Sequence, residues 1–166
     1  LMALDSASHV SVNADTRVAT TYWRYLTLKR QAKDADAALL LSIASENPDV
    51  IENASYLKAL QMFAGQTTAD SFVPKGVAIA TTASNAVTAY AASMSYFFAG
   101  QKTLARDTWK RMMGTDAWPS FGVLAAEADL ERARERRLFT ACSTACVRSR
   151  YPANPRKASS LPKVFP

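Results

Sequence analysis

The chain has 166 residues, of which 49% are hydrophobic and 20% charged, so it is long enough to bury a core as one domain. Its net charge is +6, but seven Lys or Arg residues and no acid follow Glu135, which leaves residues 1–135 with a charge of about −1. These values exclude a disordered chain and indicate a folded globular protein with a basic C-terminal end. The first residue is Leu and no apolar signal segment follows it, so we expect a processed N-terminus.

Apolar residues recur at helical spacing along most of the chain, and no alternating stretch is long enough to indicate a strand, so the predicted fold class is all-α. A first helix is expected to bury one face, formed by Val18, Tyr22, Tyr25 and Leu26. A second is expected to begin near Asp34 and Asp36, since acids suit the positive end of a helix, and to bury Ala35, Leu39 and Ile43. Asn47-Pro48 ends it, because proline disfavours helical geometry in the preceding residue.

The middle of the chain predicts two further helices. The earlier one has a continuous apolar face before Gly65, a typical C-terminal cap, and this face comprises Val50, Ala54, Leu57, Leu60 and Ala64. The later one lies within the 26 uncharged residues between Lys75 and Lys102, which are numerous enough to span a membrane. Because Ser, Thr and Ala dominate this stretch, its insertion would be unfavourable, and we expect a buried helix and no membrane span.

Two amphipathic helices and a tail complete the predicted organisation. The first turns Leu104, Ala105, Thr108, Trp109 and Met112 inward and Arg106, Asp107, Lys110 and Arg111 outward. The last follows Gly114 and Pro119, runs through Val123, Leu124 and Leu130, and exposes the charged residues Glu127, Asp129, Glu131, Arg132, Arg134 and Glu135. Four prolines after Tyr151 predict an extended tail. The predicted domains are a flexible segment over 1–15, a helical-repeat domain over 16–148 and a basic Pro-rich tail over 149–166.

A tetrapeptide repeat organises the helical part. Phe-Ala-Gly-Gln occurs at Phe63–Gln66 and again at Phe98–Gln101, 35 residues later, and Gln31 stands 35 residues before Gln66. Each position falls where one predicted helix gives way to a loop or to a second helix. Helical pairs at this period are typical of solenoids. The sequence therefore predicts a short right-handed solenoid of about three helical hairpins.

The stretch from Ser95 to Pro119 resembles one pentatricopeptide repeat, because aromatic residues, an Ala-Gly turn, Trp109, Met112 and Gly114 follow in that order. The tetratricopeptide repeat is the close alternative. The order of Asn47–Val50, Ala99–Gln101 and the Ala- and Glu-rich residues 125–135 is also similar to pentatricopeptide-like accessory subunits of the mitochondrial ATP synthase.

This resemblance implies a non-catalytic accessory subunit on the matrix side of mitochondria, after removal of a targeting segment. Its expected partners are other protein subunits of a large complex, with the ATP synthase α subunit as the first candidate. Two alternatives stay open. One is an RNA-associated repeat protein of a mitochondrial ribosome or RNA-processing complex, and the other is an accessory subunit of a respiratory complex.

Residues that could support catalysis are sparse. The only histidine, His9, is distant from the cysteines, and the five glycines form no phosphate-binding loop. Asp34 and Asp36 suit a helix start better than a cation. Cys142 and Cys146 lie about one helical turn apart, but zinc needs four ligands, so we expect two unreactive thiols. The sequence thus predicts no enzyme, no cofactor and no metal site.

Aromatic and basic residues are the candidate partner contacts, namely Tyr22, Trp23, Arg24, Trp118, Arg148, Arg150, Arg156 and Lys157. Pentatricopeptide arrays commonly bind single-stranded RNA, and the one candidate base-stacking patch is Tyr22, Trp23 and Tyr25 beside Arg24, Lys29 and Arg30. The slightly acidic charge of the repeat region argues against phosphate binding. A protein partner is therefore preferred over RNA.

Overall fold

The computed structural model describes residues 13–115 and 117–150, with side chains described as far as residue 135. Over these residues the chain forms helices and no strands, which confirms the all-α class. The chain divides into two units, residues 1–130 and 131–166. The first holds all the packed helices, and the described part of the second is the remainder of the last helix. Residues 1–12 and 151–166, which include most of the predicted N-terminal segment and tail, lie outside the described residues.

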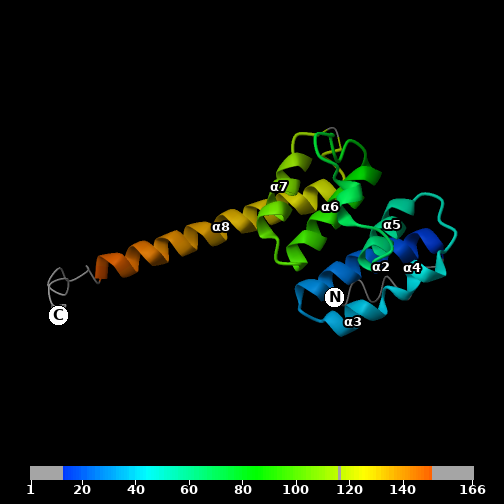
Figure 1. The fold of residues 1–166 in the computed structure, drawn as a ribbon, viewed down its shortest axis with the longest axis horizontal. Coiled ribbons are helices and arrows are strands. Elements are labelled where there is room, and N and C mark those ends of the chain that lie inside the picture. Colours follow the sequence, from blue (N-terminus) through cyan, green and yellow to red (C-terminus); the bar gives the residue numbers. More distant parts are fainter. Residues whose placement is uncertain (1–12, 116, 151–166) are drawn as a thin grey trace, which may run out of the picture. The chain divides into compact units, whose positions relative to one another are not determined.

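Helix α6 is the centre of the first unit (Figure 1). It lies against α5, α7 and the short 3-10 helix η1, while α2 lies against α3 and α5, and α4 against α5. The elements are α2 (Ala14–Arg30), α3 (Asp34–Leu39), α4 (Ser42–Glu46), α5 (Ala54–Phe63), η1 (Ala69–Phe72), α6 (Ala83–Phe98), α7 (Lys102–Met112) and α8 (Phe121–Arg150).

Small side chains allow other elements to approach α6 closely. The helix begins at the N-cap Thr82, whose hydroxyl accepts a hydrogen bond from the backbone N–H of Asn85 at 3.1 Å. Four alanines on it are fully buried: Ala86, Ala89, Ala91 and Ala92. The prediction of a buried, alanine-packed helix is confirmed. None of the helices in the described ranges combines the length and hydropathy that a membrane span requires.

The buried face predicted for α2 is confirmed, since Val18, Tyr22, Tyr25 and Leu26 are all in the core. The face predicted for the next helix is right for Ile43, which is buried, and wrong for the other two residues. Ala35 is exposed, Leu39 is 76% exposed, and the further buried residues are Ala37 and Ala44. The helix is interrupted between α3 and α4 at Leu40 and Leu41, which changes the helical register and turns a different set of side chains inward.

Other expectations about burial are also corrected. Val50 precedes α5 and is half-buried, and Ala64 is the exposed C-cap of that helix. Leu104 was expected inside but is 46% exposed, and Leu124, through which the last helix was expected to run, is 44% exposed. In the opposite direction, Asp129 was assigned to the solvated side of α8 and is only 4% exposed.

The repeated tetrapeptide marks a repeated way of ending a helix. After α5 and α6, Gly65 and Gly100 adopt positive φ values of 81° and 78°. The N–H of the next residue then donates to a carbonyl five residues earlier, from Gln66 to Gln61 and from Gln101 to Tyr96, each at 2.9 Å.

The end of α2 has the same geometry at a different register. Ala32 has φ 57°, and the N–H of Lys33 donates to the Leu28 carbonyl at 3.0 Å. The left-handed residue therefore recurs after 33 and then 35 positions, so Gln31 is the helix cap and not the equivalent of Gln66. A second helix follows at α3 and at α7, whereas η1 and an irregular segment up to Ala83 follow α5.

Candidate protein-docking surface

The indole of Trp23, on α2, is the centre of an aromatic cluster. Its ring is 5.0 Å from that of Tyr22, 6.1 Å from that of Tyr90 on α6 and 6.4 Å from that of Phe121 on α8, measured between centroids. The contacts with Tyr22 and Phe121 are edge-to-face, an arrangement that aromatic pairs favour. Trp23 therefore connects the buried core to the surface near α8.

Four apolar side chains line an open groove beside this cluster, with a volume of about 510 Å³: Trp23, Phe121, Leu124 and Ala125. We call it the Trp23 groove. Phe121 is 68% exposed although its ring contacts Trp23. Large apolar side chains gathered at a concave surface are typical of sites that bind another molecule.

The first turns of α8 are held close to α6 by a glycine. A Cβ atom placed on Gly122 would lie 2.4 Å from the carbonyl oxygen of Ala86, closer than real Cβ contacts. Gly122 thus permits a backbone contact that no other residue would allow. Val123 and Ala126 complete the buried side of α8, which leaves Phe121 and Leu124 on the opposite, exposed side.

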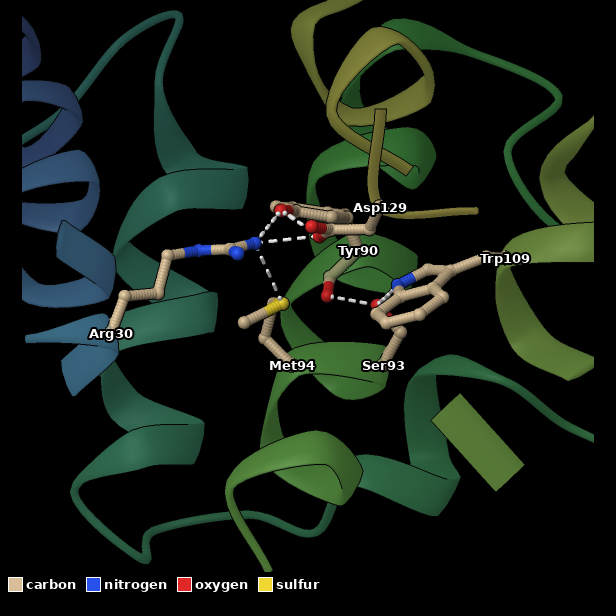
Figure 2. Close-up of polar contacts among 6 residues, drawn as sticks. All are labelled: Arg30, Tyr90, Ser93, Met94, Trp109 and Asp129. Atoms are coloured by element: carbon tan, nitrogen blue, oxygen red, sulfur yellow. Dashed lines mark hydrogen bonds and ion pairs between the residues drawn. The ribbon is translucent and has the colours of Figure 1, made fainter. Parts of the chain in front are cut away.

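A buried polar network joins the same helices next to this contact. Figure 2 shows Arg30, the last residue of α2, reaching Tyr90 of α6 and Asp129 of α8. The Arg30 Nη2 donates to Asp129 Oδ2 at 2.6 Å and to the Tyr90 hydroxyl at 2.8 Å, and that hydroxyl donates to Asp129 Oδ2 at 2.8 Å. The Arg30 side chain is 33% exposed and that of Asp129 is 4% exposed. The carboxylate is therefore buried but doubly hydrogen-bonded.

The electrostatics of the network follow from burial and from this charge pair. Burial raises the pKa of Tyr90, and the negative charge of Asp129 raises it further. Burial is the largest single effect on Arg30 and would lower its pKa, but the hydrogen bonds and charges of Asp129 and Tyr90 together outweigh it and the pKa is raised. Both groups thus keep their protons, which holds the donors of the network in place.

A second polar contact joins α6 to α7. The indole Nε1 of Trp109 donates to the Ser93 hydroxyl at 2.7 Å, and that hydroxyl donates to the Tyr90 carbonyl at 2.6 Å (Figure 2).

Elsewhere in the core, the Tyr22 hydroxyl is buried without a hydrogen-bond partner among the described residues, and burial raises its pKa well above the ordinary value.

The structure separates the predicted partner contacts. Tyr22 is 1% exposed and is a core residue, so its assignment as a surface contact is corrected. Trp23 forms one wall of the groove, Arg24 is half-buried and Trp118 is exposed in the turn before α8. The side chains of Arg148 and Arg150, and all of Arg156 and Lys157, lie outside the described residues. So do the thiols of Cys142 and Cys146.

The candidate base-stacking patch does not form a surface. Tyr22 and Tyr25 are buried, and burial raises the pKa of Tyr25 to about 12. Arg30 is bound to Asp129, and Lys29 pairs with Asp34 and lies 5.4 Å from the centre of the Phe98 ring. Tyr22 and Tyr25 thus belong to the core and are not available to stack on bases.

Sequence reasoning missed Phe121, Ala125 and Asp129. Asp129 follows Gly122 by seven residues and Ala126 by three, so helical spacing already places it on the buried side of α8. Its charge indicated exposure to solvent, and the hydrogen bonds that it accepts from Arg30 and Tyr90 help to explain its burial. Among the side chains that the structure describes, no three His, Cys, Asp or Glu residues gather as metal ligands would.

Comparison with protein-family models, with curated proteins and with solved structures finds no match to this chain.

Proposed function

We propose that this protein is a non-catalytic structural subunit of a larger mitochondrial assembly and that it docks on a partner protein through the Trp23 groove. The observation that carries the proposal is the exposure of Phe121 and Leu124 at 68% and 44% beside Trp23, on helices that are otherwise well packed. A side chain such as Phe contributes roughly 1.5–3 kcal/mol when fully buried, so a partner that covers this groove gains affinity.

The proposed architecture is a short series of pentatricopeptide-like helical pairs. The repeated cap at Ala32, Gly65 and Gly100 supports it, and the α6–α7 pair is its best-formed unit. The proposed partner is the ATP synthase α subunit, because the order of segments is similar to that of the eighteen-kilodalton pentatricopeptide-like subunit of the euglenozoan enzyme. The core position of Tyr22 and Tyr25 favours a protein partner over single-stranded RNA.

The test is a native pull-down of the tagged full chain from mitochondria, with nuclease added to half of the sample, followed by mass spectrometry. We expect ATP synthase α and β subunits in both halves. Recovery of ribosomal proteins that disappear with nuclease would contradict the proposal and favour RNA association. Recovery of respiratory-complex subunits would also contradict it and favour an accessory subunit of a respiratory complex.

Variants test whether the co-purifying partner binds at the Trp23 groove. Phe121→Ser with Leu124→Ser should abolish co-purification, because both substitutions remove exposed apolar surface while leaving the buried side of α8 intact. The matched control is Ile51→Ser, which removes an 87% exposed apolar side chain from the loop before α5 and should leave the recovery unchanged. Equal losses in both variants would contradict docking at the groove.

A further inference from the structure

Helices α2 and α8 contact each other at two points with a common spacing. Trp23 contacts Phe121 at one point and Arg30 binds Asp129 at the other. The two points are seven residues apart on α2 and eight apart on α8, which is about two helical turns in each case. The helices therefore run in the same direction over this stretch, with the Trp23 groove at one end and the polar network at the other.

The polar network accepts only one register of α8. Arg30 and Tyr90 both direct donors at one oxygen of Asp129, so the carboxylate must lie within hydrogen-bond distance of both. One turn away along α8, Ala125 or Ala133 would take its place, and neither side chain can accept a hydrogen bond. Because Tyr90 is buried, any other register leaves its hydroxyl without this acceptor, while the one-third exposed Arg30 loses its ion pair and can only turn to water.

Apart from Gly122, the apolar contact is less selective for rotation about the helix axis. Gly122 admits the Ala86 carbonyl, but the other buried apolar residues of α8, Val123 and Ala126, are small or medium and have little shape to interlock. Buried polar groups can fix register even where they contribute little net stability, as a single polar position does in coiled coils. Asp129 lies one turn from Ala125 and two turns from Phe121, so its position determines where both side chains face Trp23.

We propose that Arg30, Tyr90 and Asp129 are the positioning residues of the Trp23 groove: their network fixes the register and rotation of α8 on α2 and α6 and so builds the groove wall. The importance of the groove for docking rests on the proposed function. The claim about its geometry does not, and it can be tested without a partner.

The test uses the full chain labelled with 5-fluorotryptophan, which gives one ¹⁹F resonance for each of the three tryptophans; Trp23→Phe identifies that of Trp23. The double variant Arg30→Met with Asp129→Leu replaces the ion pair by apolar side chains of similar size. We expect it to keep its helical circular dichroism and its Trp109 resonance, while the Trp23 resonance broadens or splits because α8 samples several registers.

The matched control removes an exposed pair, with Lys110→Met and Asp107→Leu, whose charged atoms are 3.5 Å apart on α7. It should leave the Trp23 resonance as in the unmodified protein. A single sharp Trp23 resonance at the unmodified position in the Arg30→Met, Asp129→Leu variant would overturn the proposal. If that variant does not fold, Asp129→Ala alone removes the acceptor that Arg30 and Tyr90 share, and an unchanged Trp23 resonance there would again overturn the proposal.

The two proposals fail separately. If the Trp23 resonance broadens in the Arg30→Met, Asp129→Leu variant but ATP synthase is still recovered with the Phe121→Ser, Leu124→Ser variant, docking at the groove is contradicted and the positioning role is supported. If the Trp23 resonance is unchanged in the first variant but recovery is lost in the second, the positioning role is contradicted and docking at the groove is supported.

Discussion

Asp15 and Asn53 bind each other across 38 positions of sequence. The Asp15 Oδ1 accepts from the backbone N–H of Asn53 at 2.7 Å, and the Asn53 Nδ2 donates back to the Asp15 carbonyl at 3.0 Å. The same carboxylate accepts from the N–H groups of Glu52 and Ile51, at 2.8 Å and 3.2 Å. Asn53 is the N-cap of α5 and makes no side-chain cap hydrogen bond, so a residue of α2 fixes the chain that leads into α5 by binding the N–H groups of this N-cap and of the two residues before it.

The first prediction concerns acid. Hydrogen bonds from the backbone of Asn53 and Ile51 lower the pKa of Asp15 below its ordinary value of 3.8. A group with a lowered folded-state pKa stabilises the fold above its unfolded pKa, and this contribution disappears as pH falls through the folded value. Asp15→Ala should therefore lower the urea midpoint at about pH 7 and have progressively less effect as pH falls below the ordinary Asp pKa of 3.8.

The control for this prediction is Asp49→Ala, which removes an exposed acid from the same loop. It should change the midpoint little at neutral pH or in acid. An Asp15→Ala effect that stays constant as pH falls would contradict the role of the ionised carboxylate.

The second prediction is an asymmetry within the Arg30–Asp129 pair. Arg30→Met removes the Arg30 charge from beside a buried carboxylate, and should cost about 3–5 kcal/mol of unfolding free energy. Asp129→Asn should cost less, about 1–2 kcal/mol, because the Arg30 side chain is one-third exposed and can turn to water. Urea titrations of both variants measure the difference.

Arg17→Met is the reference for a surface pair, since the ion pair of Arg17 with Glu46 leaves both side chains 48% exposed. Its expected cost is about 0–1 kcal/mol. If Asp129→Asn cost more stability than Arg30→Met, the loss of the Arg30 charge beside the buried carboxylate could not be the main cause.

The third prediction compares two buried hydroxyls. Tyr22→Phe removes a hydroxyl that has no hydrogen-bond partner among the described residues, so it should be neutral or stabilise the protein by up to about 1 kcal/mol. Tyr90→Phe removes a hydroxyl that both donates and accepts, and should cost about 1–3 kcal/mol. Thermal unfolding of the Tyr22→Phe and Tyr90→Phe variants under the same conditions measures the direction of each stability change. Equal destabilisation by both variants would contradict the prediction.

The fourth prediction concerns Gly122→Ala. Alanine usually favours a helix over glycine, but here its Cβ would lie 2.4 Å from the Ala86 oxygen and 2.6 Å from the Ala86 carbonyl carbon. Neither backbone atom can turn away as a side chain would, so we expect a loss of about 1–3 kcal/mol. Glu127→Ala, an exposed substitution on the same helix, should stay within about 0.5 kcal/mol. A Gly122→Ala protein more stable than the original would contradict the close contact.

The fifth prediction concerns the segment that follows η1. The Arg111 guanidinium donates to the carbonyl oxygens of Pro74 and Val77, at 2.8 Å and 2.9 Å, and to that of Val73 at 3.4 Å. A lysine cannot reproduce this fork, so Arg111→Lys should speed amide exchange across residues 73–80. Lys110→Ala, on the adjacent exposed position, should leave that exchange unchanged, and equal protection in Arg111→Lys would contradict the role of the fork.

Local sequence patterns predicted the helices well and their exposed faces less well. Helix ends at Asn47 and at both Phe-Ala-Gly-Gln motifs follow from residue type alone, because a cap needs only neighbouring atoms. Whether Leu39, Leu104 and Leu124 are buried depends on where a helix is interrupted and on which other elements pack against it. An apolar side chain indicates that burial is favourable, and the fold decides whether a covering element is present.

The groove and its network were beyond the reach of local reasoning for the same reason. Asp129 is separated from Arg30 by 99 residues and from Tyr90 by 39, and a single sequence gives no sign that these side chains meet. Trp23 was identified as a contact residue because it is aromatic and stands beside Arg24. Its neighbour Phe121 opens a helix more than ninety residues later, and only the packing of α8 brings the two rings together.

The alanines of α6 decide which mutational scan would be informative for this protein. Ala86, Ala89, Ala91 and Ala92 are fully buried, yet replacement of residues by alanine leaves all four positions untouched. Truncation at these sites removes a single methyl group, whereas Val or Leu there would drive the neighbouring backbones apart. A survey of sensitivity by alanine scanning would thus leave these four positions of α6 silent, and a scan toward larger side chains would find them intolerant.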